Sequence, residues 1–370
     1  MCGSSHRDDA GRWLSDNESV GYMRLLFTNI WTCFVLFSVL TTSEAQELPI
    51  RVIRHVAMYT DFEAILYGES SNTDPEALLS AGRAGFEAVD ALEKRISNWK
   101  PDSYTSLANK KAADAPVEVS GDLIEILDDA RKIYTTTDGA FDVTVGPLIQ
   151  FWKEREKGGM FPRSEELKPV LEHIGLKYVI VDTKAQTVFF ERDGIQLDFG
   201  GIAKGLALDR MANILTENGV KTARLNAGSS TIVAMGAPPG EEGWTVDILS
   251  PYNTADLTPV ATVKIRDEAL STSADTVRHI DIGGKRYSHI YNPHTGMPAS
   301  GIASATVITP SGVESDALST AFFVMGVEAA HAYCQAHPSV RAILVQDKGE
   351  GSEPIFINFT KENKRSGDEH

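Results

Sequence analysis

Cysteine is scarce in this sequence. Only three cysteines occur in 370 residues, and they are Cys2, Cys33 and Cys334. If the chain is cut before Gln46, Cys334 remains alone, and the protein then has no internal disulfide. A chain of this length can bury a core large enough to fold without such cross-links.

An excess of basic residues is also missing. The chain has 35 lysines and arginines against 51 aspartates and glutamates, which gives a formal net charge of −16. A nucleic-acid partner requires a basic face, so this balance argues against one. Any site for phosphate must therefore be built locally.

A hydrophobic run long enough to span a membrane is absent as well. The longest apolar stretch covers residues 25–40, whereas a span needs about 20 apolar residues. Small residues follow at Ser43 and Ala45, as in a signal-peptidase site. We therefore predict an N-terminal extension and signal peptide over residues 1–45 and an exported protein, periplasmic or in the cell envelope. The alternative is an uncleaved segment that anchors the protein in the membrane.

The patterns of the remaining chain predict an α+β fold. Asp74-Pro75 and Ser120 are typical helix starts, and apolar residues at helical spacing follow both. Short apolar runs separated by turn residues predict many strands, so we expect mixed or antiparallel sheets packed with helices. We predict one large domain over residues 46–360 and a disordered polar tail over 361–370.

A glycine-rich segment carries the clearest chemical signal. Residues 197–205 read Leu-Asp-Phe-Gly-Gly-Ile-Ala-Lys-Gly, which predicts a strand that ends on Asp198, a glycine turn, and a helix with Lys204 in its first turn. Free N–H groups at a helix start and close backbone approach at glycines suit a phosphate group. The spacing matches neither the P-loop nor the dinucleotide-binding pattern. A plain glycine turn with a solvated Lys204 is the alternative.

Four further stretches stand beside this segment, at residues 139–148, 271–274, 287–298 and 315–321. In this order, the five together resemble the motifs of the ApbE family of FAD:protein FMN transferases. The resemblance extends from about residue 52 to about residue 358. It implies an ApbE-like, T-fold-like arrangement of sheets and helices in one domain.

The resemblance also implies an activity. Members of this family use FAD as substrate and Mg²⁺ as cofactor, and they move FMN to a Ser or Thr hydroxyl of a partner protein while AMP leaves. The partner implied here is a flavin-accepting redox protein, with the enzyme peripheral to a membrane. The alternative is an exported FAD-binding protein, or an FAD pyrophosphatase without protein flavinylation.

A metal site can be placed on the last of these stretches. Asp316 and Thr320 are four residues apart at the start of a predicted helix and therefore share one face. Mg²⁺ prefers oxygen ligands, and the resemblance adds the backbone carbonyl of Gly201, with Ser319 as a neighbour. The choice between Mg²⁺ and Mn²⁺ stays open. In the alternative reading, Asp316 caps the helix and Thr320 only packs.

The resemblance assigns FAD contacts to residues spread along the chain. These are Met58, Trp99, Ala140, Phe141, Asp142, Asp198, Lys204, His289 and Ile290. His289 and Asp198 are the candidates for catalysis. Transfer to a hydroxyl needs a base, and Asp198, Asp316 and His289 could each act as one. Trp99 could instead be a packing residue, and Asp142 a turn residue.

Four positions depart from the pattern that the resemblance implies. Tyr59 replaces a glycine, Ser229 replaces a glycine, Asn292 replaces an aspartate, and His294 replaces an arginine. We expect Tyr59 and His294 to reshape the flavin pocket or to weaken docking of the protein substrate, and Ser229 to change only a backbone turn. The proposed metal residues are unchanged.

Overall fold

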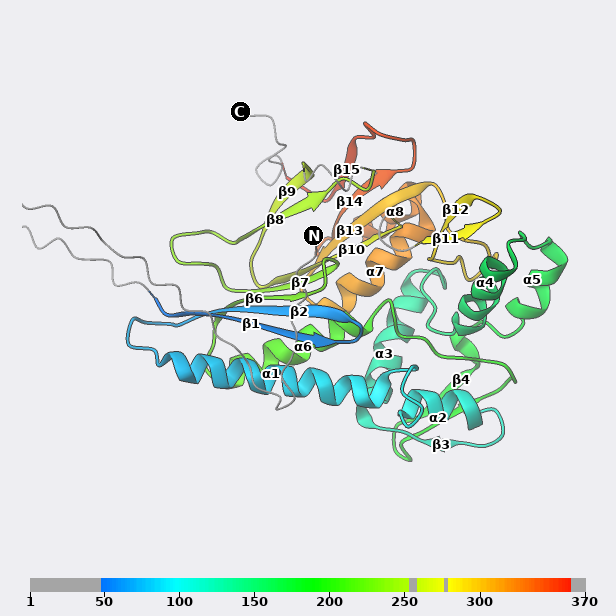
Figure 1. Ribbon diagram of the computed structural model, residues 1–370, viewed down its shortest axis with the longest axis horizontal. Helices are drawn as coiled ribbons and strands as arrows, with labels where there is room; N and C mark the ends of the chain where they lie inside the picture. Colours follow the sequence, from blue (N-terminus) through cyan, green and yellow to red (C-terminus); the bar gives the residue numbers. More distant parts are fainter. Residues whose placement is uncertain (1–47, 253–257, 276–278, 361–370) are drawn as a thin grey trace, which may run out of the picture. The chain divides into compact units, whose positions relative to one another are not determined.

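An eight-stranded antiparallel sheet forms the centre of the fold in this computed structural model, which describes residues 48–252, 258–275 and 279–360 (Figure 1). The expected signal peptide and the expected disordered tail lie outside these residues. The strands are, in sheet order, β1 (Ile50–Ala57), β2 (Thr60–Tyr67), β6 (Thr222–Ala227), β7 (Thr231–Met235), β10 (Glu268–Ala274), β13 (Ile302–Thr309), β14 (Arg341–Gln346) and β15 (Pro354–Ile357). The predicted α+β class is confirmed.

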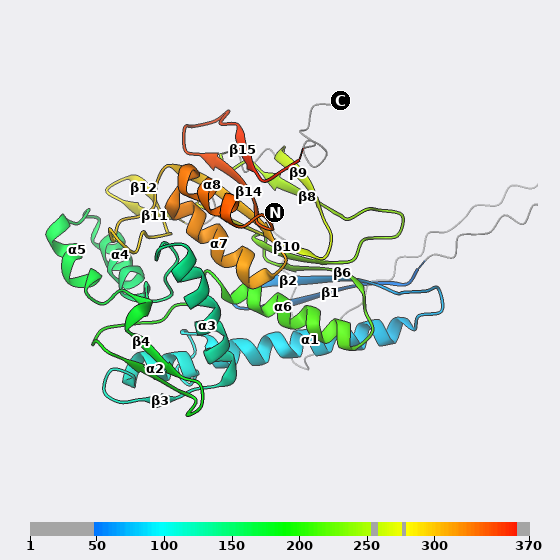
Figure 2. The same ribbon diagram turned by 180° about the vertical axis from the view of Figure 1, so that it is seen from behind.

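Both faces of this sheet are covered. Successive residues of a strand point to opposite faces, and here the side chains on each face are apolar. On β10 and β13, Ala269 and Val307 belong to the core under the helices. Their neighbours Leu270 and Ile308 belong to a separate core under a hairpin. The helices are α1 (Pro75–Ile96), α6 (Ala203–Glu217) and α7 (Gly312–Met325), and the hairpin is β8 (Trp244–Leu249) with β9 (Pro259–Ile265) (Figures 1 and 2).

The remaining elements form smaller groups. One is a three-stranded sheet in the order β3 (Val117–Glu118), β5 (Thr187–Phe190) and β4 (Val179–Asp182). Another is the hairpin of β11 (His279–Ile282) and β12 (Lys285–Ser288). The other helices are α2 (Tyr104–Lys111), α3 (Gly121–Thr136), α4 (Gly146–Gly158), α5 (Ser164–Leu171) and α8 (Val327–Ala336). None of the helices in the described ranges is long and apolar enough to cross a membrane.

The helix ends follow the sequence signals closely. The Asp74 side chain accepts a hydrogen bond from the Glu76 N–H, and Pro75 is the first residue of α1. The Ser120 side chain caps α3 in the same way. Gly219 follows α6 with a φ of 80°, a conformation that glycine adopts at little cost.

Two predicted element boundaries were wrong. Residues 195–197 do not form a strand, since only an isolated bridge joins Gln196 to Val145. The helix predicted to begin at Asp316 begins at Gly312, because Ser311 accepts the hydrogen bond from the Glu314 N–H. Asp316 is therefore in the second turn of α7 and does not cap it.

An apolar and an aromatic residue form the turn between β1 and β2. Ala57 pairs with Thr60, so Met58 and Tyr59 form the two-residue turn. Both have positive φ, 49° and 59°, as a type I′ turn requires. Glycine or asparagine is usual at these two positions, so the sequence Met58-Tyr59 does not indicate a turn.

A third, smaller core joins α4 and α5 to the stretch at 287–298. Trp152 of α4 is fully buried, and its indole Nε1 donates to the Gly296 carbonyl at 2.7 Å. Its ring also stacks on Tyr291, with 6.1 Å between the ring centroids.

Asp209 connects the two helices that carry the site, and its loss should destabilise the protein. Its carboxylate accepts from the Gly312 N–H at 2.7 Å and from the Val313 N–H at 2.9 Å. We expect Asp209→Ala to lower the free energy of unfolding by about 2 kcal/mol, because it removes this side-chain cap from α7. Urea denaturation measures the change. Asp129→Ala is the control, because it removes a carboxylate that pairs with Lys132. If this variant lowers the free energy of unfolding as much as Asp209→Ala does, the capping role is wrong.

Candidate flavin and metal site

The glycine loop at residues 198–202 is held by side-chain and backbone contacts in place of the predicted strand. Asn109 of α2 donates to the Leu197 carbonyl at 3.0 Å and accepts from the Leu197 N–H at 2.7 Å. The Asp198 N–H donates to the Val143 carbonyl at 2.7 Å. One amide side chain thus takes the place of a neighbouring strand, and the loop lies against the stretch at 139–148.

The carboxylate of Asp198 has a defined orientation. One oxygen accepts from the Gly200 N–H at 2.9 Å, and the other accepts from Asn98 Nδ2 at 2.7 Å. Asn98 did not emerge from the sequence, where its only signal was its position beside Trp99. The two hydrogen bonds hold a half-buried carboxylate at the mouth of the glycine loop.

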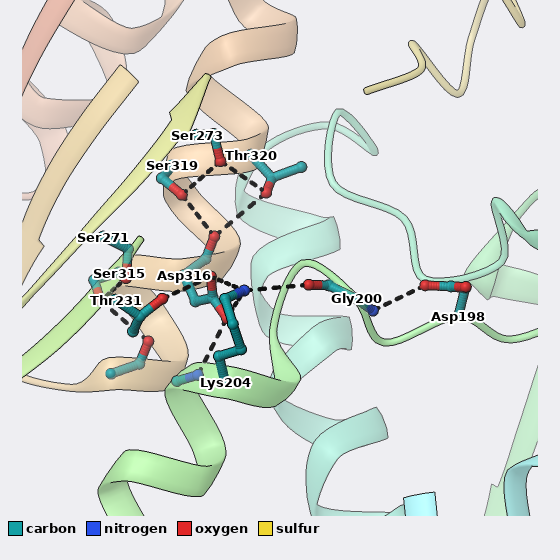
Figure 3. A network of polar contacts seen from close by, with 12 residues as sticks. Asp198, Gly200, Lys204, Thr231, Ser271, Ser273, Ser315, Asp316, Ser319 and Thr320 are labelled. Atoms are coloured by element: carbon teal, nitrogen blue, oxygen red, sulfur yellow. Dashed lines mark hydrogen bonds and ion pairs between the residues drawn. The ribbon is translucent and has the colours of Figure 1, made fainter. Parts of the chain in front are cut away.

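Lys204 and Asp316 meet in an ion pair next to this loop (Figure 3). Lys204 Nζ lies 3.1 and 3.3 Å from the two carboxylate oxygens of Asp316 and 3.4 Å from the Gly200 carbonyl oxygen. The Asp316 side chain is only 6% exposed. It also accepts from the Gly205 N–H at 3.1 Å and from the Thr231 hydroxyl at 3.3 Å. The alternative of a solvated Lys204 is therefore wrong.

Two of the proposed metal residues, Gly201 and Thr320, lie close together, and Thr320 follows Asp316 by one turn of α7. The Thr320 hydroxyl lies 3.4 Å from the Asp316 carbonyl oxygen and 3.2 Å from the Ser273 hydroxyl, which also contacts Ser319 at 2.8 Å (Figure 3). A methyl group built at Gly201 would lie 3.1 Å from Thr320 Oγ1. Ser273 therefore supports Thr320 from β10, a role that the sequence did not reveal.

The stretch at 139–148 borders the same loop. A methyl group at Gly201 would also lie 3.2 Å from the Phe141 ring. Ala140, Phe141 and Asp142 are all buried. Burial raises the pKa of Asp142, and hydrogen bonds from Thr144 and the Leu176 N–H oppose that rise. These bonds are internal to the fold and favour the turn role for Asp142, whose contact with FAD stays a prediction.

Two exposed aromatic rings stand near Asp198. Trp99 is 59% exposed and Tyr59 is 71% exposed, and their ring centroids are 6.4 Å apart in an edge-on arrangement. Lys153 Nζ lies 4.3 Å from the centroid of the Trp99 ring. The alternative of Trp99 as an internal packing residue does not fit this exposure. Met58 is half-buried and packs against the main core.

The stretch at 287–298 lies beside the stretch at 139–148. His289 and Ile290 are half-buried just after β12, and Ile290 packs against the main core. A methyl group at Gly139 would lie 3.3 Å from the His294 ring, which places His294 beside the stretch at 139–148. The proposed roles of His289 and Ile290 stay predictions.

A cavity of about 950 Å³ lies elsewhere, and Asp209, Glu314, Tyr333 and His337 are among its lining residues. None of the site residues proposed from the sequence lines it.

Comparison with known protein families agrees with this geometry. A model described as the ApbE family matches residues 58–344. The FAD:protein FMN transferase of Treponema pallidum is 30% identical over 274 residues, which cover 70% of this chain and 75% of that protein. One from Klebsiella pneumoniae is 28% identical over 261 residues, covering 70% and 80%.

Solved structures agree at the level of the fold. The ApbE protein of Thermotoga maritima superposes with a TM-score of 0.75 at 27% identity, over 86% of this chain and all of that one. The flavin transferase ApbE of Vibrio cholerae gives a TM-score of 0.71 at 24% identity, over 84% and 97%. The expected arrangement of sheets and helices is thereby confirmed.

Proposed function

Because this chain belongs to the ApbE family and is an FAD:protein FMN transferase, we propose that it transfers FMN from FAD to a Ser or Thr hydroxyl of a partner protein in a Mg²⁺-dependent reaction. The observation that carries this proposal is the convergence of the Asp198 loop, the start of α6 and the Lys204–Asp316 pair. Transfer at a pyrophosphate depends mainly on positioning and charge neutralisation. The convergence provides both.

The residues present fit a magnesium ion. The proposed ligands are the Asp316 carboxylate, the Thr320 hydroxyl and the Gly201 carbonyl, all of them oxygen donors. Among the described residues no group of three or more His, Cys, Asp or Glu side chains could hold a metal. The proposed ion would instead be held by one carboxylate together with neutral oxygens and substrate phosphates. When bound, Mg²⁺ would polarise the pyrophosphate and stabilise the departing AMP.

The chain itself would supply orientation and proton transfer. The Lys204 ammonium and the positive end of the α6 dipole suit the negative charge of the pyrophosphate. The N–H groups of Ala203 and Gly205 already donate to the Phe199 carbonyl and to Asp316, so the expectation of free N–H groups at this helix start is wrong for these two. Asn98 would fix Asp198 close to the phosphate that is attacked. Asp198, Asp316 and His289 remain the candidates for the base that takes the proton of the attacking hydroxyl.

Release of AMP tests the function. The chain from Gln46 is incubated with FAD, Mg²⁺ and a candidate acceptor protein, and AMP and protein-bound flavin are measured. We expect one AMP to be released for each flavin bound to a Ser or Thr of the acceptor. Neither product should form when EDTA is present. A binding protein would release no AMP. A pyrophosphatase would release AMP and free FMN at a rate that the acceptor does not change.

We also predict that the protein binds FAD more tightly than FMN. The Trp99 and Tyr59 rings would contact one end of FAD, and Lys204 would contact its phosphates, so the adenosine half should add contacts. The dissociation constant for FAD should be about tenfold lower, which corresponds to 1.4 kcal/mol. Titrations of flavin fluorescence measure both constants. Equal values would contradict a site that spans the dinucleotide.

We propose further that the protein is exported to the periplasm or cell envelope, where it acts on a flavin-accepting redox protein at the membrane. The apolar run at 25–40 and the small residues before Gln46 support this. N-terminal sequencing of the protein from the envelope fraction should begin at Gln46. An intact N-terminus there would indicate an uncleaved anchor.

A further inference from the structure

The carboxylate of Asp316 has no vacant position for a metal ion. Oδ1 accepts from Lys204 Nζ and from the Thr231 hydroxyl, and Oδ2 accepts from the Gly205 N–H and from Lys204 Nζ (Figure 3). An ionised carboxylate offers about four lone-pair positions. All four are in use, so a metal ion can bind Asp316 only after one donor has left.

Lys204 is the donor that can leave. The Gly205 N–H belongs to the backbone of α6, and Thr231 is fully buried on β7. The Lys204 side chain is 21% exposed, and a lysine stem is flexible. Its ammonium already contacts the Gly200 carbonyl oxygen of the glycine loop. A dication and an ammonium on one buried carboxylate would also repel each other strongly.

We propose that Lys204 and the metal ion exchange places on Asp316, an inference that rests on the proposed Mg²⁺-dependent function. In the metal-free protein Lys204 neutralises the buried carboxylate. Metal binding releases the ammonium, which then faces the pyrophosphate of FAD, the other anion of the site. Metal binding and FAD binding are thereby coupled, because each is favoured once Lys204 has moved.

Chemical labelling of lysine tests this exchange without measuring activity. The chain from Gln46 is treated with an amine-acetylating reagent, and the modification of Lys204 is followed by mass spectrometry. Saturating Mg²⁺ alone should make the labelling of Lys204 about fivefold faster. Addition of FAD together with Mg²⁺ should slow it again, because the ammonium then contacts phosphate.

Two controls define the scale. Lys132 on α3 pairs with Asp128 and Asp129, both at 2.9 Å. Because neither partner is a proposed metal ligand, the labelling of Lys132 should not respond to Mg²⁺. In Asp316→Asn the carboxylate charge is absent, so Lys204 should label quickly with or without Mg²⁺.

Unchanged or slower labelling of wild-type Lys204 at saturating Mg²⁺ would overturn the exchange. If the same preparation still releases AMP in a Mg²⁺-dependent reaction, the proposed function stands and only the exchange is wrong. Absence of both the labelling response and the Mg²⁺-dependent reaction would reject the metal site itself.

Discussion

Replacement of Asp316 by alanine should abolish Mg²⁺-dependent release of AMP from FAD. Asp316 is the only carboxylate among the proposed metal ligands, and its side chain is 6% exposed. Mg²⁺ binds weakly to neutral oxygens alone, so the loss should be at least about a hundredfold in turnover. Turnover is measured at low millimolar Mg²⁺ with saturating FAD.

Two further variants make this test specific. Glu314→Gln removes a half-buried carboxylate from the same helix, outside the Asp316 cluster, and should keep nearly full activity. Asp316→Asn keeps the volume of the side chain and an acceptor for the Gly205 N–H, so it separates loss of the metal ligand from loss of structure. Circular dichroism should be unchanged. Wild-type turnover in both Asp316 variants would show that the metal assignment is wrong.

Replacement of Gly205 by alanine should cause the largest loss of stability. The helices α6 and α7 cross at Gly205 and Gly312, and a methyl group at Gly205 would lie 2.0 Å from the Gly312 carbonyl oxygen. Neither backbone can move aside without separating the helices. We expect Gly205→Ala to lower the free energy of unfolding by about 3 kcal/mol and to disturb the Lys204–Asp316 pair.

A matched glycine supplies the control. Gly121, the first residue of α3, has no atom within 4 Å of a methyl group built on it. Gly121→Ala should therefore change the free energy of unfolding by less than about 1 kcal/mol, in the stabilising direction. Chemical denaturation of both variants measures the difference. Similar stability of the two would mean that the close crossing of α6 and α7 is not required.

Gly205 also illustrates how the sequence reading was incomplete. The glycines of residues 200–205 suggested close approach of a phosphate group. In the structure Gly205 allows two helix backbones to meet, and Gly201 allows the loop to lie against Thr320 and Phe141. Glycine therefore allows helix packing at position 205 and close packing of the site loop at position 201. The spacing of the glycines in the sequence does not distinguish these two roles.

The local sequence was enough to predict the α+β class and the starts of α1, α3 and α6, whereas the roles of the proposed site residues stay predictions. These follow from nearest-neighbour chemistry: Asp74 caps a helix through its own backbone neighbours, and the motif order carries the family resemblance. The strand expected at 195–197 and the helix start expected at Asp316 were wrong, because in both places a side chain that the prediction did not consider supplies the hydrogen bonds. Asn109 and Ser311 supplied the hydrogen bonds that decided those boundaries.

Only the tertiary structure decided what each charged group faces. Nothing in the spacing places Lys204 on Asp316, which is 112 residues away, or Asn98 on Asp198, which is 100 residues away. Those pairings arise because α6 and α7 cross at two glycines and because the loop after α1 reaches the glycine loop. Burial then fixes the result, since a carboxylate as enclosed as Asp316 requires a partner for its charge.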